Sequence, residues 1–191
     1  MIRIDLQVQL KYDVSAPGAD FIFNIHPAYT PCQQVSAESL QISQDVEWHI
    51  QTDPGTGNRH LRLQAAAGEL EIRYEATVEL LHRRDQPAEL REVPVHLLPL
   101  DVLQYIYPSR YCQSDRLIKL AMAEFGDIPA GHGRVQAIAK WIQSRVSFTS
   151  NTSTSTTSAV DTLIERTGVC RDFTHLMVAL CRALNIPARF A

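Results

Sequence analysis

Hydrophobic and polar residues alternate along much of the first ninety residues. The longest run, residues 2–12, places an apolar side chain at every second position, which is the period of a β-strand with one buried face. The same period recurs at residues 21–25, 46–50, 61–65 and 70–80, and turn-forming stretches separate these runs. The pattern predicts antiparallel strands that form a β-sandwich or a curled sheet, with a structural or substrate-positioning role.

The hydrophobic period changes in the second half of the chain. Pro94, Pro99 and Pro108 exclude a regular helix or a central strand, so we interpret residues 93–113 as a proline-rich connector. Apolar residues at helical spacing then predict a helix from Ser114 to about Gly126, with its apolar face at positions 117, 118, 121, 122 and 125. A second helix follows, with apolar positions 135, 138, 142 and 146. The predicted fold is α+β: a β-sandwich domain at 1–92, the connector at 93–113 and a helical domain at 114–191.

A single cysteine precedes the most apolar of the predicted helices. Cys170 lies three residues before Phe173, which begins a stripe at positions 173, 176, 177, 180, 181 and 184. We therefore expect Cys170 in the first turn of the helix, at the end of that stripe and facing the interior. Unpaired N–H groups at a helix N-terminus stabilise an anion, and this favours the thiolate of a nucleophilic cysteine. The alternative is a small buried apolar residue without a chemical role.

The polar residues near Cys170 allow more than one interpretation. Residues 148–157 are almost entirely serine and threonine, which is typical of a solvated connector but also suits the rim of an active-site cleft. Arg171, Asp172 and Arg182 are interpreted as solvated or interdomain charges. Asp172 lies about 200° around the helix from Cys170, so we do not expect it to orient a catalytic histidine.

Residues 157–189 resemble the catalytic-cysteine segment of the transglutaminase-like superfamily. In that family a short helix leads through Gly-x-Cys, here Gly168 to Cys170, into the helix that carries the nucleophile. The helix then closes with a Leu-Gly-Ile-Pro-Ala-Arg turn, and here Asn185 replaces the usual glycine, which is a small departure because asparagine tolerates the same conformation. Residues 107–115 and 135–148 look like the bacterial branch, which carries a β-rich domain before the core. The resemblance implies that residues 114–191 form the helical first part of a papain-like core.

The resemblance also implies a Cys-His-Asp triad, of which this sequence supplies only Cys170 in a matching position. The family's His and Asp lie on strands downstream of the cysteine helix, whereas this sequence stops where the first such strand would begin. His175 should face away from the thiol, because it lies about 140° around the helix. The remaining histidines match no family segment; they are His26, His49, His60, His82, His96 and His132. We therefore expect a truncated, inactive piece of a longer enzyme, whose uncovered helix face favours self-association.

Composition and charge narrow the classes of function. The net charge of −3 argues against nucleic acid or an anionic membrane surface as a partner. There is no apolar signal core at the N-terminus, and no stretch approaches the ~18 apolar residues of a membrane span. The four cysteines show neither CxxC nor zinc-like spacing, so we expect reduced thiols in a cytoplasmic protein. The chemistry that the resemblance implies needs no metal or organic cofactor.

With Cys170 at a helix N-terminus, the resemblance implies thiol-based acyl chemistry at an amide bond of a protein or peptide. Cys170 would attack the carbonyl carbon, and the acyl group would pass to water, as in a cysteine protease or amidase, or to an amine, as in a transglutaminase. We favour hydrolysis of the amide. The alternative is a non-catalytic protein-interaction scaffold that retains a transglutaminase-like fold. A His-bearing strand followed by an Asp-bearing strand in the downstream reading frame would favour the enzyme.

Overall fold

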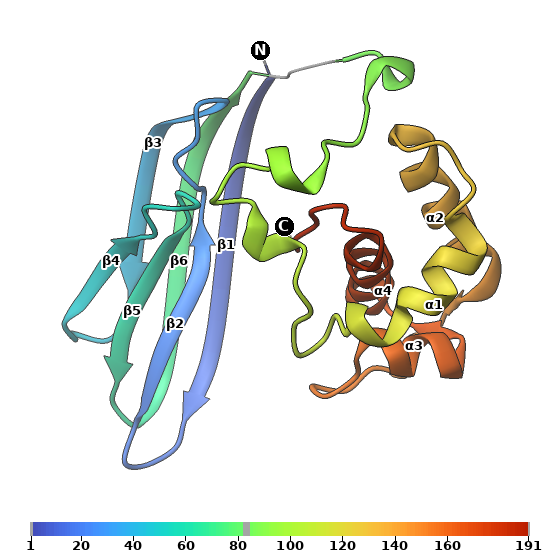
Figure 1. The fold of residues 1–191 in the computed structure, drawn as a ribbon. Coiled ribbons are helices and arrows are strands. Elements are labelled where there is room, and N and C mark those ends of the chain that lie inside the picture. The colour runs from blue at the N-terminus through green and yellow to red at the C-terminus, as the bar shows by residue number, and fades with distance from the viewer. Residues whose placement is uncertain (1, 82–84, 191) are drawn as a thin grey trace. The chain divides into compact units, whose positions relative to one another are not determined.

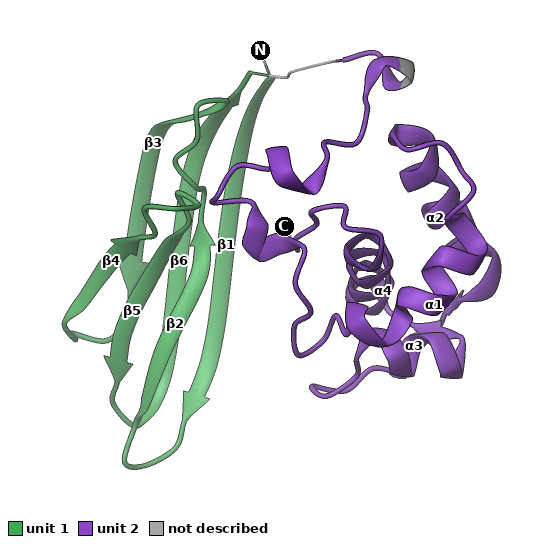
Figure 2. Ribbon diagram, viewed as in Figure 1, with its two compact units in different colours: residues 1–84 green, residues 85–191 purple. Residues whose placement is uncertain are grey.

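The structure is a computed structural model that describes residues 2–81 and 85–190. Contacts between Cα atoms divide the chain into two compact units, residues 1–84 and residues 85–191 (Figure 2). The first unit is all β, and the second contains every α-helix of the described residues. The segment predicted as a connector, residues 93–113, lies within the second unit. The fold is therefore α+β, as the sequence predicted.

The first unit is a sandwich of two three-stranded antiparallel sheets (Figure 1). Its strands are β1 (Ile2–Val14), β2 (Ala19–His26), β3 (Gln33–Ile42), β4 (Trp48–Thr52), β5 (Arg59–Ala65) and β6 (Gly68–Leu80). One sheet has the order β1-β6-β3 and the other β2-β5-β4. Strands β1 and β6 pair without a bulge along their full lengths, from Ile2 opposite Leu80 to Val14 opposite Gly68.

Alternating side chains from both sheets fill the space between them. Leu70 and Ile72 of β6 and Leu61 of β5 are fully buried, as the two-residue period requires when one face of a sheet is covered. The sequence did not predict β3. Its alternation is weak, and a bulge between Val35 and Ala37 shifts the register with β6, so the apolar positions lose their regular spacing.

A polar cluster in the first unit joins the buried residues His26, Arg59 and Tyr74 to the exposed residues Tyr29 and Glu38. The Arg59 guanidinium donates two hydrogen bonds to the Glu38 carboxylate, at 2.8 and 2.9 Å, and lies 4.3 Å from the centre of the Tyr29 ring. The Tyr74 hydroxyl also donates to Glu38, at 2.8 Å. The His26 ring packs 4.2 Å from that of Tyr74, and neither of its buried nitrogens has a hydrogen-bond partner among the described residues. Burial and the nearby Arg59 charge lower the pKa of His26.

The second unit begins with three short 3₁₀ helices and continues with four α-helices and a pair of two-residue strands. The 3₁₀ helices are Pro87–Glu89, Val95–Leu97 and Leu103–Tyr105. The later elements are α1 (Ser114–Phe125), α2 (His132–Arg145), β7 (Ser147–Phe148), α3 (Ala159–Glu165), β8 (Thr167–Gly168) and α4 (Cys170–Ala183). None of the helices in the described parts of the chain is long and apolar enough to cross a membrane.

Helix α4 lies at the centre of the second unit, where α1, α2 and α3 all contact it (Figure 1). Leu176, Ala179 and Leu180 are fully buried on one face, and Val178 and Cys181 are buried at other angles around the helix, so α4 is covered on most sides rather than along one stripe. The face predicted for α1 was partly wrong. Ile118 and Met122 are 48% and 55% exposed, because the side of α1 that packs on α4 carries Leu117, Ala121 and Phe125.

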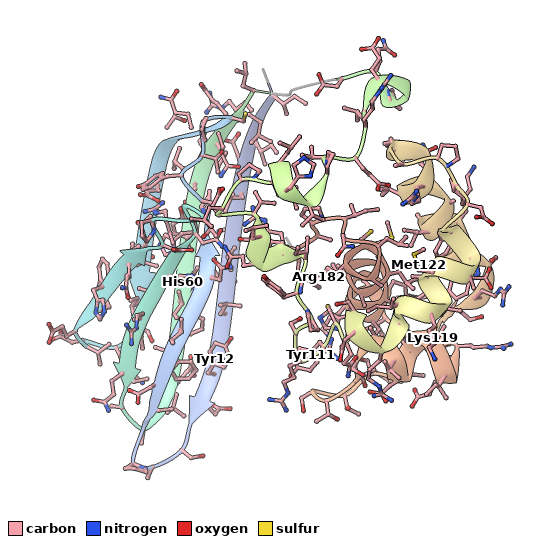
Figure 3. The ribbon with its side chains drawn as sticks, in the orientation of Figure 1. Tyr12, His60, Tyr111, Lys119, Met122 and Arg182 are labelled. Atoms are coloured by element: carbon pink, nitrogen blue, oxygen red, sulfur yellow. The ribbon has the colours of Figure 1, made fainter. Side chains whose placement is uncertain are left out.

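Backbone and side-chain hydrogen bonds fasten the segment before α1 to the helices of the same unit. Tyr105 C=O accepts from Ala188 N–H, and Tyr111 C=O accepts from Ala159 N–H. The Arg182 guanidinium donates to the carbonyls of Tyr107 and Ala188. Tyr111 and Arg182, labelled in Figure 3, therefore belong to one hydrogen-bonded framework around α4. Arg182, which the sequence suggested was solvated or interdomain, is instead bonded within its own unit.

Candidate active site

Cys170 is the first residue of α4 and is exposed. The prediction that it lies in the first turn is confirmed, and the prediction that it faces the interior is wrong. Phe173, at the start of the predicted stripe, is itself only half-buried, so a residue one turn before it lies outside the core. The most reactive type of side chain in the sequence is thus presented to solvent, as nucleophilic chemistry requires.

A short parallel pair of strands sets the chain direction just before Cys170. Strand β7 pairs with β8, with Ser147 opposite Thr167 and Phe148 opposite Gly168. The pair is extended by Thr149 N–H, which donates to Gly168 C=O at 3.0 Å. The end of α2 and the start of α4 are therefore held side by side, two residues from the thiol.

The first turn of α4 leaves two N–H groups free near the thiol. Val169 C=O accepts from the N–H groups of Asp172 and Phe173, and Val169 N–H donates to the Asp172 side chain. The N–H groups of Cys170 and Arg171 have no hydrogen-bond partner among the described residues. Free N–H groups at a helix N-terminus are suited to hold an oxyanion or a thiolate.

Asp172 is completely buried, so the interpretation of this residue as a solvated charge was wrong. Its Oδ2 accepts from Val169 N–H at 2.9 Å, and its Oδ1 accepts from Ser153 Oγ at 2.8 Å. Arg171 Nε lies 3.5 Å from Oδ1. A buried carboxylate is tolerated when hydrogen bonds and a cation compensate for lost solvation. An acidic residue at the third position of a helix is a known capping signal, so the contact with Val169 could have been predicted.

The polar loop at residues 149–157 is ordered by its own hydroxyl groups and covers the start of α4. Thr154 and Thr157 bond to each other through backbone and side-chain groups, and Ser153 reaches Asp172. Arg171 Nη2 donates to Ser153 Oγ and to Thr154 C=O, each at 2.5 Å. These contacts fasten the loop to Arg171 and Asp172 in the first turn of α4, which a freely solvated connector would not show; its role as the rim of an active-site cleft stays a prediction.

The exposed face of α4 continues from Cys170 as a shallow hollow. Phe173, Thr174 and Met177 follow Cys170 at helical spacing, and they meet Ala139, Ile142 and Gln143 of α2 around a volume of about 240 Å³. The hollow is mainly apolar.

A larger hollow, of about 430 Å³, lies at the other end of α4. It is lined by apolar residues that include Leu98, Val102, Val135 and Ile186. Since Ile186 follows the C-terminus of α4, a helix of this length separates the hollow from Cys170 by roughly 20 Å. We therefore do not assign it to the nucleophile.

No histidine hydrogen-bonds to the Cys170 thiol among the described residues. His175 lies on another side of α4, where its ring stacks on Tyr111 at 5.2 Å and packs against Phe190 at 5.6 Å. Burial, together with the positive charge of Arg171, lowers the pKa of His175. His175 is thus a buried residue that lies on another side of α4 from Cys170, as its helical position predicted. His82 lies outside the described residues.

The other cysteines differ from Cys170 in their surroundings. Cys112 and Cys181 are buried, and burial raises the pKa of both thiols, that of Cys181 to about 12. Cys32 is exposed and lies in the first unit, in the segment between β2 and β3. Within residues 2–81 and 85–190 no group of three His, Cys, Asp or Glu side chains could hold a metal ion.

Comparisons with known proteins match both units of the chain. Residues 122–191 match the family model described as the transglutaminase-like superfamily. Residues 2–101 match the model described as the N-terminal domain of bacterial transglutaminases. Between them, the two matches leave residues 102–121 uncovered.

A solved structure and a curated relative extend these matches. The crystal structure of a protein from Cytophaga hutchinsonii, described as a "Putative Cysteine Protease", has a TM-score of 0.87 and 40% identity over 96% of this chain and 67% of that protein. An uncharacterized protein of Mycobacterium leprae is 36% identical over 56 residues, or 29% of this chain. The match spans 20% of that relative's length.

Proposed function

Since the chain belongs to the transglutaminase-like superfamily, we propose that Cys170 is the nucleophile of a cysteine-dependent hydrolase that acts on amide bonds of proteins or peptides. The observation that carries the proposal is the exposed thiol at the N-terminus of α4, next to two free backbone N–H groups. The similarity to the Cytophaga hutchinsonii protein favours hydrolysis over transfer to an amine.

The proposed reaction proceeds through a thioester on Cys170. The thiolate attacks the carbonyl carbon of the amide, a C–S bond forms, and the carbonyl oxygen becomes an oxyanion that the Cys170 N–H can hold. The C–N bond then breaks, and the amine leaves with a proton from a general acid. Water attacks the thioester, which releases the carboxylic acid and restores the thiol.

The proton transfers need a histidine and a residue that orients it. Among the described residues none fills these roles beside Cys170, so we assign only the nucleophile to them. We propose that a Cys-His-Asp triad is completed by residues outside those described. The four unpaired cysteines support a reducing compartment such as the cytoplasm as the place of action.

An activated ester tests the nucleophile without a general acid. The acetyl group of p-nitrophenyl acetate can be transferred to a thiolate directly, because its leaving group needs no proton. We expect one acetyl group per chain, located on Cys170 by peptide mass mapping, and none at that peptide in Cys170→Ser. Acetylation of Cys32 in preference to Cys170 would refute the assignment.

The absence of a histidine contact to Cys170 among the described residues favours a second candidate, a non-catalytic interaction scaffold. The same experiment separates the two functions. A scaffold has no need of an activated thiol, so Cys170 and Cys32 would then react with the ester at similar rates.

A further inference from the structure

We propose that Asp172 and Ser153 are positioning residues for Cys170. In this proposal the buried Asp172 carboxylate joins the start of α4 to the loop 149–157, and so fixes the direction of the thiol and of the free Cys170 N–H. The inference rests on the proposed role of Cys170 as nucleophile. It assigns to Asp172 and Ser153 an indirect role in positioning that nucleophile.

The hydrogen bonds of Asp172 come from two segments that are far apart in the sequence. Val169 N–H belongs to the entry of α4, and Ser153 Oγ belongs to the loop. Arg171 contacts Asp172 and also donates to the loop at Ser153 and Thr154. Residues 149–157 carry no charged side chain, so the charges in this cluster are those of Arg171 and Asp172. Loss of the carboxylate would remove the acceptor that both segments share.

Apart from the effect of its charge, Asp172 can act on Cys170 only through the backbone. The two side chains are about 200° apart around α4. Yet the Asp172 side chain lies so close to the chain entering the helix that a Cβ atom on Gly168 would be 2.8 Å from Asp172 Cβ. The carboxylate therefore restrains the backbone from Gly168 to Val169, and that backbone carries Cys170.

The loop is also held at points away from Asp172. Thr149 N–H bonds to Gly168 C=O, the Tyr111 hydroxyl donates to Ser155 C=O at 2.8 Å, and Ser158 caps α3 together with Asp161. Since both ends are fixed, Ser153 at the middle of the loop can transmit this order to Asp172. In this proposal the loop supports the first turn of α4, which carries Cys170.

Loss of the Asp172 charge and loss of its positioning role should shift the pH of half-maximal Cys170 alkylation in opposite directions, and the test uses this difference. Asp172→Asn removes a negative charge near the thiol, which alone would favour the thiolate and lower the pH of half-maximal alkylation. The Asn side chain can accept only one of the two hydrogen bonds, because its Nδ2 is a donor. If positioning dominates, the first turn loosens, the thiolate loses stabilisation by the helix, and that pH rises.

We expect Asp172→Asn to raise the pH of half-maximal iodoacetamide labelling at Cys170 by about 0.2 to 0.7 units, the range that loss of a helix N-terminal interaction implies. Ser153→Ala changes no charge and should raise it less, in the same direction. Ser150→Ala is the matched control, since this exposed hydroxyl in the same loop has no hydrogen bond among the described residues. Labelling is resolved by peptide mass in the 191-residue chain.

The outcomes separate this proposal from the proposed function. If Cys170 and Cys32 of the unmodified chain show the same pH of half-maximal labelling, the activated thiol is refuted. If Cys170 titrates lower than Cys32, but Asp172→Asn and Ser153→Ala leave its value unchanged or lower it, the positioning role is refuted and the nucleophile stands. Should Asp172→Asn fail to fold, Ser153→Ala decides alone, because it removes only a half-exposed hydroxyl.

Discussion

Substitution of Gly168 by alanine should destabilise the second unit, because no space exists for the added methyl group. A Cβ atom there would lie 2.8 Å from Asp172 Cβ and 3.1 Å from Asp172 Oδ2, and two hydrogen bonds prevent that side chain from moving away. Overpacking of this kind costs about 1 to 3 kcal/mol. For a unit of roughly a hundred residues, a loss of this size lowers the Tm by about 4 °C or more.

Thermal unfolding followed by far-ultraviolet ellipticity measures this effect, since the α-helices of the described residues all lie in the second unit. Gly133→Ala provides a control of opposite sign. Nothing lies within 4 Å of a Cβ at Gly133, in the first turn of α2, so alanine should stabilise the unit by about 0.5 kcal/mol. A Gly168→Ala chain as stable as the parent, with Gly133→Ala behaving as expected, would refute the packing argument.

Three further outcomes follow from the described contacts. Limiting iodoacetamide at neutral pH should label Cys170 before Cys32, and equal labelling of the two in peptide mass maps would contradict this. Burial lowers the pKa of His26, so as the pH drops the unfolded chain takes up a proton at His26 before the folded chain does. The free energy of unfolding should therefore decrease as the pH is lowered from about 6.5. In urea unfolding, His26→Phe should make this decrease smaller. Glu38→Ala leaves the buried Arg59 charge without its carboxylate, at a cost of about 2 to 4 kcal/mol in the free energy of unfolding. The double variant Glu38→Ala, Arg59→Met should recover much of this loss. A double variant as unstable as Glu38→Ala would refute the role assigned to the Arg59–Glu38 ion pair.

Much of the architecture could be predicted, because the spacing of apolar residues distinguishes strands from helices. The run at residues 2–12 became β1, and the helix before Gly126 ends at Phe125. Strand β3 could not be found in this way, because its bulge interrupts the period. A local pattern reports burial only where the backbone is regular.

The site was predictable in part, for a similar reason. The position of Cys170 at a helix start depends on its immediate neighbours, so the sequence was sufficient to place it. Its orientation depends on which sides of α4 other helices cover, and this is set by contacts distant in the sequence. The partnership of Asp172 with Ser153 spans 19 residues, and no pattern in either segment signals it.

The strand order of the sandwich has a consequence for synthesis on the ribosome. In the native structure β1 and β3 pair only with β6, and β2 and β4 pair only with β5. The first four strands therefore emerge from the ribosome without a native partner, and each waits for one of the last two. The β2-β5-β4 sheet can therefore assemble only after residue 65 is available, and the β1-β6-β3 sheet only after residue 80. Until then the nascent chain exposes unpaired strand edges, the state in which β-proteins are most open to aggregation and to chaperone binding.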